Sequence, residues 1–168
     1  MKKWLIIGIW IRFLIIPITF HSDTRFFIMA NYFLVAQNLW MGFYDYLGSS
    51  NEILANIAPP DAFTYPPLAI LTNGIFSFIT YKLISLDFIK NFIIDPNLYI
   101  GQLQFYWLLL LTKAPYLIAD ISAGLVLSKL VSKPETQTKI FKYWMLNPIT
   151  IYATFGIGMF DIYPTLAT

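Results

Sequence analysis

The segment from Leu103 to Leu130 constrains the fold most, because it is almost entirely apolar and longer than the roughly 20 residues that a helix needs to cross a bilayer. A soluble domain of 168 residues has a large surface, which needs many polar groups to cover it. Charged residues make up only 12% of this chain, about half of the roughly 25% found in soluble domains. We therefore expect an all-α integral membrane protein, with residues 1–168 forming a single membrane domain.

Charge and residue types exclude several classes of function. The net charge of +2 is too small to provide an electrostatic footprint for nucleic acid, so no nucleic-acid partner is expected. The absence of cysteine excludes disulfides, thiol catalysis and thiolate metal sites. His21 is the single histidine, so a histidine cluster cannot hold a metal ion, and we expect no metal site.

Three spans are predicted, over residues 4–20, 103–130 and 143–158 of a helical membrane bundle. The first follows Lys2 and Lys3. A secretory signal peptide is the alternative for this run, but Arg12 interrupts it and no small-residue cleavage site follows. Four lysines occur in or at the ends of the loop 129–142. The positive-inside rule therefore places this loop and the N-terminus in the cytoplasm.

Residues 21–103 then form one long outer loop that contains interfacial or re-entrant helices. Its apolar segment 66–81 has Asn73 and Gly74 in the middle, and as a helix it would reach about 24 Å, less than the ~30 Å hydrocarbon core. If this segment spans, the lysine-rich loop moves outside; if it does not, both lysine clusters stay inside. We therefore predict a re-entrant or interfacial helix over 66–81. A second helix, over 26–40, is predicted to lie in the membrane interface.

Two opposite charges are predicted to meet inside the membrane. Counting along the helices from the cytoplasmic lysines places Arg12 and Asp120 at one depth, about 13 Å from the inner face. Ionised side chains inside a bilayer are costly unless they are paired. We expect a structural ion pair between the first two spans, with direct contact to a substrate as the alternative. Lys113 shares a helical face with Asp120, and its ammonium is expected to extend toward the membrane surface.

Two other carboxylates are predicted to reach the outer surface. The same count places Asp23 about 30 Å from Lys3, and Asp161 roughly 28 Å from Lys142. Neither side chain is forced to be buried, so neither requires a partner. The simplest interpretation is a pair of solvated loop carboxylates, but the motifs around them favour a functional role.

Five short motifs occur in a fixed order along the chain. They are Phe20-His21-Ser22-Asp23, Tyr65-Pro66-Pro67-Leu68, Leu117-Ile118-Ala119-Asp120, Leu146-Asn147-Pro148 and Gly158-Met159-Phe160-Asp161. Their order and spacing resemble the N-terminal part of the GT-C superfamily of multi-spanning glycosyltransferases, especially the enzymes that take mannose or glucose from a polyprenyl phosphate. The resemblance covers nearly the whole chain. Family members usually show Gly-Gln-Phe-Asp or Gly-His-Phe-Gln at the last motif; here Met159 replaces the amide or imidazole, and Asp161 is retained.

This resemblance implies a hexosyltransferase, of the mannosyltransferase type, that works on the non-cytoplasmic face. Its donor would be a polyprenyl-phosphate sugar, and its acceptor a hydroxyl of a glycan or a lipid-linked molecule. Asp23 would be the catalytic base, and Asp161 would orient the acceptor or share a divalent cation with Asp23. His21 and Arg25 would face the donor phosphate, and Tyr65 would join the substrate-binding residues. No cofactor is implied beyond that cation.

Members of the family have many more than three spans, so the chain is expected to be the N-terminal part of a longer enzyme. Its membrane would be the plasma membrane in a prokaryote and the endoplasmic reticulum in a eukaryote. The alternative is a small non-catalytic membrane protein or a transporter fragment. In a transporter, Arg12 and Asp120 would form a polar site at the midplane, although no inverted repeat supports this.

Single cysteines test the predicted topology, since the chain has none of its own. An impermeant thiol reagent added outside the membrane should label Ser85→Cys and leave Thr136→Cys unlabelled, because the lysine-rich loop remains inside. Permeabilised membranes provide the control, in which both variants react. Labelling of Thr136→Cys but not Ser85→Cys from outside would contradict the predicted topology.

Overall fold

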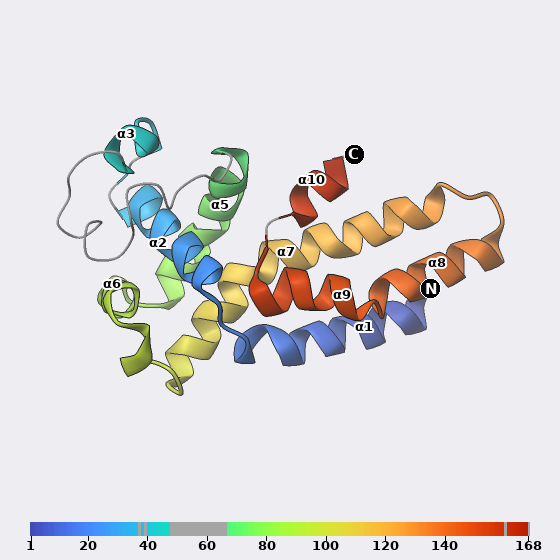
Figure 1. Ribbon diagram of the computed structural model, residues 1–168, viewed down its shortest axis with the longest axis horizontal. Coiled ribbons are helices and arrows are strands. Elements are labelled where there is room, and N and C mark those ends of the chain that lie inside the picture. The colour runs from blue at the N-terminus through green and yellow to red at the C-terminus, as the bar shows by residue number, and fades with distance from the viewer. Residues whose placement is uncertain (37, 39, 48–66, 160, 168) are drawn as a thin grey trace. The chain divides into compact units, whose positions relative to one another are not determined.

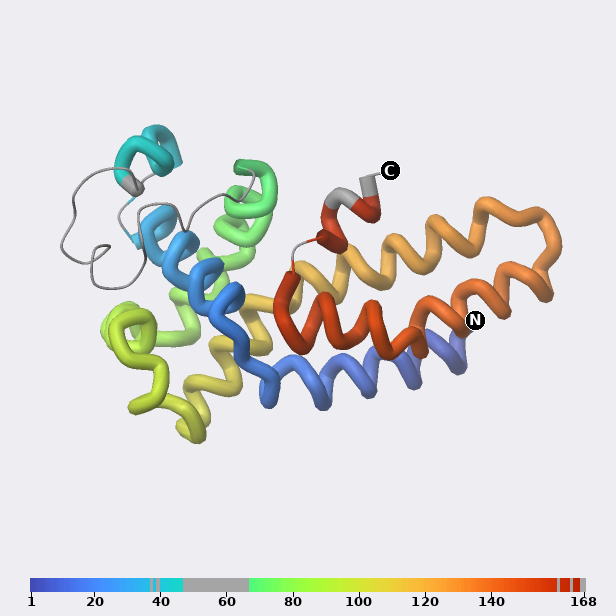
Figure 2. The backbone as a smooth tube through the Cα atoms, viewed as in Figure 1, coloured from blue at the N-terminus to red at the C-terminus, as the bar shows by residue number. Residues whose placement is uncertain are grey.

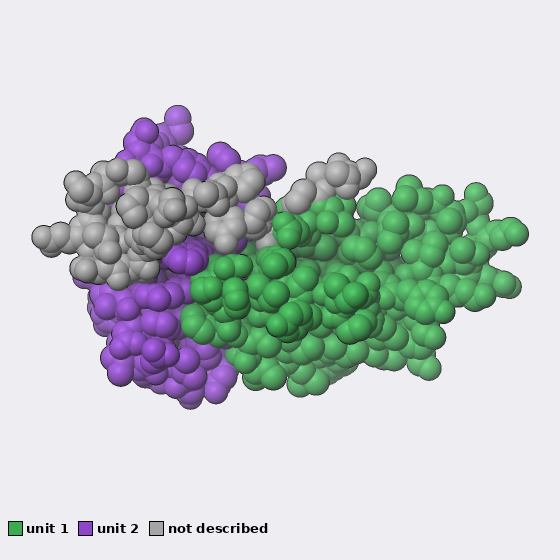
Figure 3. Space-filling view, viewed as in Figure 1, with its two compact units in different colours: residues 1–23, 113–168 green, residues 24–112 purple. Residues whose placement is uncertain are grey.

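The computed structural model describes residues 1–36, 38, 40–47, 67–159 and 161–167. Their regular structure is helical, and no strand occurs within these ranges. Contacts between residues group the chain into two compact units, where the sequence analysis treats it as one domain. Unit 1 comprises residues 1–23 and 113–168, and unit 2 comprises residues 24–112 (Figure 3).

One helix is long and apolar enough to cross a membrane. This helix is α7, Leu103–Lys129, and it coincides with the predicted span 103–130. Two broken helix pairs reach the same threshold only when each pair is counted as one span. The first pair is α1 (Lys2–Ile15) and η1 (Ile16–Ile18) with α2 (Ser22–Ala36); the second is α5 (Pro67–Leu83) with α6 (Leu86–Ile94). By length and composition, the described residues therefore contain one candidate span, or up to three.

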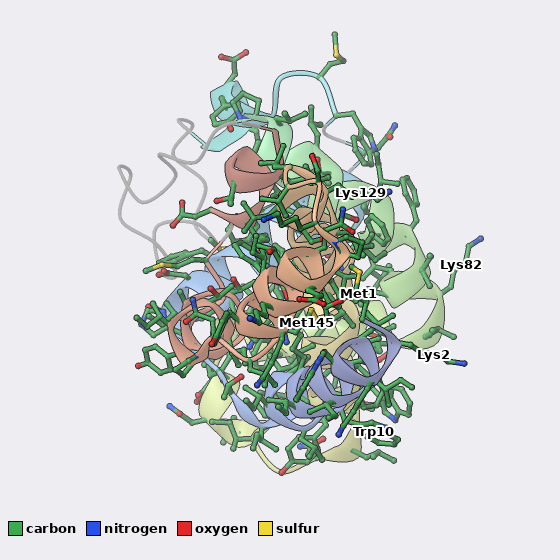
Figure 4. All side chains as sticks on the ribbon, turned by 90° about the vertical axis from the view of Figure 1, so that its right-hand side faces the viewer. Met1, Lys2, Trp10, Lys82, Lys129 and Met145 are labelled. Atoms are coloured by element: carbon green, nitrogen blue, oxygen red, sulfur yellow. The ribbon has the colours of Figure 1, made fainter. Side chains whose placement is uncertain are left out.

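Within unit 1, α1 packs against the helices that follow α7. It contacts α8 (Pro134–Met145) and η3 (Tyr152–Ile157), and these segments run side by side in Figures 1 and 2. Gly8 allows the close approach, because a Cβ atom there would lie 2.4 Å from the terminal methyl carbon of Met145. Met145 is fully buried, whereas Trp10 on the outer side of α1 is 61% exposed (Figure 4). One face of α1 is therefore packed and the other is exposed.

The structure divides the predicted span 143–158 into separate helices. Its first residues complete α8, which also occupies much of the predicted loop 129–142. Helix α9 (Pro148–Ile151) then begins at Asn147, whose side-chain oxygen accepts from the backbone N–H of Ile149 at 2.9 Å. The break follows from local chemistry, because proline is favoured in the first turn of a helix and asparagine caps its N-terminus.

The second part of this segment is the π-helix η3. It ends at Gly158, which adopts a left-handed φ of 86° that glycine tolerates without steric cost. The short helix α10 (Ile162–Ala167) follows. The chain therefore changes direction between η3 and α10, and Asp161 lies in this connection.

Unit 2 contains the two predicted helices of the outer loop. The helix predicted over 26–40 is α2, which begins at Ser22 and ends at Ala36. It buries Phe27, Phe33 and even Asn31, so it is a core helix of unit 2 and not one with a single buried face.

The helix predicted over 66–81 is α5, and α6 follows it at an angle of 114°. Ser85 caps α6 by accepting from the backbone N–H of Phe88. This geometry is that of a broken span or a re-entrant loop. The described residues of this unit also include the short helices α3 (Phe43–Leu47) and η2 (Pro96–Leu98) and the first part of α7.

The packing of α7 on α8 predicts a cost for enlarging Gly124. A Cβ atom at this position would lie 2.5 Å from Cδ1 of the Trp144 indole, a rigid ring that cannot give way locally. Gly124→Ala should therefore lower the free energy of unfolding by about 1–3 kcal/mol, as overpacked cores do. Thermal unfolding in detergent measures this loss. Val126→Ala, at a 51% exposed position of the same helix, is the control and should have little effect. Equal stability of the two variants would contradict this packing.

Candidate active site

Arg12 and Asp120 form a buried ion pair in unit 1, with both side chains fully enclosed. Arg12 Nε donates to Asp120 Oδ2 at 2.5 Å, the contact that the sequence predicts. Trp144 Nε1 donates to Oδ1 of the same carboxylate at 3.0 Å and to the Asp120 carbonyl at 2.9 Å. Both carboxylate oxygens are therefore satisfied, as a buried anion requires.

A second nitrogen of the guanidinium, Nη1, is bound to backbone. Arg12 Nη1 donates to the carbonyl of Met145 at 2.7 Å and to that of Gly8 at 3.1 Å. The Met145 carbonyl is available because α8 ends there and the N–H of Ile149 is bound by Asn147. Arg12 Nη2 has no hydrogen-bond partner among the described residues. The full enclosure of the Arg12 and Asp120 side chains favours a structural role for the ion pair over direct contact with a substrate.

The expectation that Lys113 extends toward the membrane surface is wrong. Its side chain is fully buried, and Nζ donates to the carbonyls of Phe155 at 2.6 Å and Thr19 at 2.7 Å. Nζ also contacts the Thr19 hydroxyl at 3.1 Å. The same hydroxyl lies 2.7 Å from the Phe155 carbonyl, which accepts from it. No carboxylate within the described part of the chain forms an ion pair with Lys113.

Helix ends supply the acceptors for this cation. Thr19 is the C-cap of η1, and Phe155 lies near the C-terminal end of η3. Carbonyls at the end of a helix lack intrahelical donors and carry the negative end of the helix dipole. Two such ends converge on one ammonium, which offsets the cost of burying it. The sequence analysis missed Thr19 and Phe155, because a backbone carbonyl acceptor has no residue signature.

Asp23 is a partly exposed carboxylate at the N-terminus of α2. Its side chain is 30% exposed, and Oδ1 lies 3.4 Å from His21 Nδ1. The backbone N–H of Asp23 donates to the same ring nitrogen at 3.3 Å, and Ser22 Oγ lies 3.5 Å from Oδ1. The first turn of a helix stabilises negative charge. The side chain is therefore open on one side and has the His21 ring beside it.

Asp161 is exposed and precedes α10. Its backbone carbonyl accepts from the N–H and the hydroxyl of Thr165. No hydrogen bond or ion pair joins Asp161 to Asp23 in the part of the chain that the structure describes. Nor do three or more His, Asp or Glu side chains gather there. A cation shared by Asp23 and Asp161 would therefore have no third carboxylate or histidine ligand among these residues.

Arg25 has a structural position in unit 2. Its guanidinium donates to the carbonyls of Ile93, at 2.6 Å from Nη2, and of Ile94, at 3.2 Å. It thus caps the C-terminal end of α6 and ties α2 to it, a use that competes with the expected contact to a donor phosphate. Tyr65, the remaining predicted substrate-binding residue, lies outside the described residues.

No family model, curated protein or solved structure matches the chain. What the site can do therefore follows from its own chemistry. A half-open carboxylate beside a histidine can accept a proton from a hydroxyl, and the buried cluster around Lys113 and Arg12 can hold the surrounding backbone in place.

The ion pair predicts strongly coupled effects of mutation. Arg12→Met leaves an unpaired buried carboxylate, and Asp120→Asn leaves an unpaired guanidinium while keeping an acceptor for Trp144. Each single change should cost about 3–5 kcal/mol of stability. The double variant removes both charges and should be more stable than either single variant. Thermal unfolding of the four proteins measures this coupling, and a double variant with the summed loss of both singles would contradict it.

Proposed function

We propose that this chain is the N-terminal part of a multi-pass membrane glycosyltransferase. The enzyme transfers a hexose from a polyprenyl-phosphate donor to an acceptor hydroxyl on the non-cytoplasmic side. The observation that supports this most is the hydrogen bond from Thr19 Oγ1 to the Phe155 carbonyl, at 2.7 Å. It joins two motif-bearing segments that are far apart in the sequence. One leads to Asp23 and the other to Asp161.

In this reaction Asp23 acts as the general base. Its carboxylate takes the proton of the acceptor hydroxyl while the hydroxyl oxygen bonds to the anomeric carbon of the sugar. The bond between that carbon and the phosphate oxygen breaks, and the polyprenyl phosphate leaves with the electron pair. Proton removal by a positioned carboxylate contributes about 10²–10⁴-fold to such a rate. Asp161, exposed and at the start of α10, orients the acceptor.

His21 is suited to assist Asp23. The ring lies beside the carboxylate and is itself 46% exposed, so a substrate can reach both groups. In its neutral form the ring adds a hydrogen-bonding site, and in its protonated form it adds a positive charge that can face the donor phosphate. The contact with the donor phosphate is therefore assigned to His21, because Arg25 is bound to the end of α6.

A donor with a polyprenyl tail requires an enzyme in the membrane, and two features support this location. Helix α7 is long and apolar enough to span. Large apolar side chains also lie exposed along α1, where lipid would cover them: Ile6, Trp10, Phe13 and Leu14. The transporter alternative needs an accessible polar pair at the midplane, whereas Arg12 and Asp120 are enclosed and engaged.

Replacing the proposed base tests this function. Asp23→Asn keeps the size and polarity of the side chain but removes its basicity. In the complete protein that contains this chain, reconstituted in lipid, turnover should fall by about a hundredfold or more. Donor binding and expression should stay near normal.

Two comparisons make the result specific. Asp87→Asn is the matched control, since Asp87 is also an exposed aspartate in the first turn of a helix and should be dispensable. Asp161→Asn is measured alongside and should weaken acceptor use. Normal turnover of Asp23→Asn would contradict the assignment, and a selective loss in Asp161→Asn would move the base to that residue.

A further inference from the structure

We infer that Lys113 is a positioning residue for the proposed transfer reaction, holding the segments that carry Asp23 and Asp161 in a fixed relation. This inference rests on the proposed function. It begins from the contacts of one ammonium group with two separate segments. Nζ donates to Thr19, four residues before Asp23, and to Phe155, six residues before Asp161.

The ammonium can fix the orientation of the two segments as well as the distance between them. It has three donors, and three acceptor atoms surround it: the carbonyls of Phe155 and Thr19, and the Thr19 hydroxyl. The hydroxyl also donates to the Phe155 carbonyl, so the three groups form a closed cluster. Two segments bound to one point through several hydrogen bonds cannot slide past each other without breaking one of them.

The backbone between the cluster and the carboxylates is short. After Thr19, Phe20 and His21 lie outside any helix, and α2 begins at Ser22. After Phe155, the helix η3 ends within two residues, and Gly158 turns the chain with its left-handed φ of 86°. Thr19 is therefore the last residue bound by Lys113 before the chain reaches Asp23. Phe155 is likewise the last residue bound by Lys113 before the chain reaches Asp161.

A lysine is a costly way to fill this space. An apolar side chain of similar length would pack there without the desolvation of a charge, and such replacements are often neutral or stabilising. An apolar side chain such as methionine cannot, however, donate a hydrogen bond to the carbonyls of Thr19 and Phe155. Directed bonds matter for catalysis, because a displacement of about 1 Å at a reacting group can reduce the rate by about a hundredfold.

A distance measurement tests the positioning without any assay of activity. Spin labels are attached at Ser22→Cys and Met159→Cys, two exposed positions on the two segments of a chain that has no other cysteine. Double electron–electron resonance then gives the distance distribution in lipid. Lys113→Met should broaden or shift it. Lys142→Met is the matched control, because Lys142 is a lysine of the same unit that packs on Trp4 instead.

Threonine variants keep the test decisive if Lys113→Met does not fold. Thr19→Val removes the hydroxyl at nearly constant volume and should broaden the distribution, whereas Thr19→Ser should restore it. In the transfer assay with the complete protein, Lys113→Met and Thr19→Val should reduce kcat by about tenfold to a hundredfold. The KM for the donor should change much less, and Thr19→Ser should again restore the rate.

The outcomes separate this inference from the proposed function. An unchanged distance distribution in Thr19→Val and Lys113→Met would overturn the positioning role, whatever the activity. A broadened distribution with normal kcat would overturn it as well. Absence of transfer by the unmodified complete protein would contradict the proposed function, and the distance comparison would still decide whether Lys113 holds the two segments together.

Discussion

A cation enclosed in apolar surroundings needs acceptors, and in this protein the ends of helices provide most of them. Lys113 binds the carbonyls of Thr19 and Phe155, and Arg12 binds that of Met145. Arg25 in unit 2 binds the last carbonyls of α6 in the same way. Only Arg12 has a carboxylate as well, in Asp120. Carbonyls at helix ends therefore supply acceptors to all three cations, beside the Asp120 carboxylate that pairs with Arg12.

The broken helices of unit 1 meet part of this requirement. A continuous helix over 143–158 would keep its carbonyls in intrahelical hydrogen bonds and would remove the Met145 and Phe155 carbonyls as acceptors for Arg12 and Lys113. The break at Asn147 and Pro148 frees the Met145 carbonyl for Arg12, and the end of η3 frees that of Phe155 for Lys113.

The sequence predicts the elements whose signal lies in residue type. The apolar run 103–130 gives α7, and equal depth leads to the contact of Arg12 with Asp120. The span predicted over 143–158 is instead broken at Asn147 and Pro148. The rest depends on backbone atoms. The direction of the Lys113 side chain depends on backbone carbonyls that become free only where helices end. The types of the side chains do not reveal these carbonyls. The burial of α2 likewise depends on neighbours that its own periodicity does not reveal.

Lys113 joins the Thr19 and Phe155 segments inside the protein. Solid-state NMR of the protein in a bilayer tests it most directly, with ¹⁵N at the lysine Nζ atoms and ¹³C at the phenylalanine carbonyls. The structure places Lys113 Nζ 2.6 Å from the Phe155 carbonyl oxygen, so a strong dipolar coupling between that nitrogen and the carbonyl carbon is expected. A mobile Nζ signal with no coupling to a phenylalanine carbonyl would show that Lys113 points elsewhere, and would contradict this account.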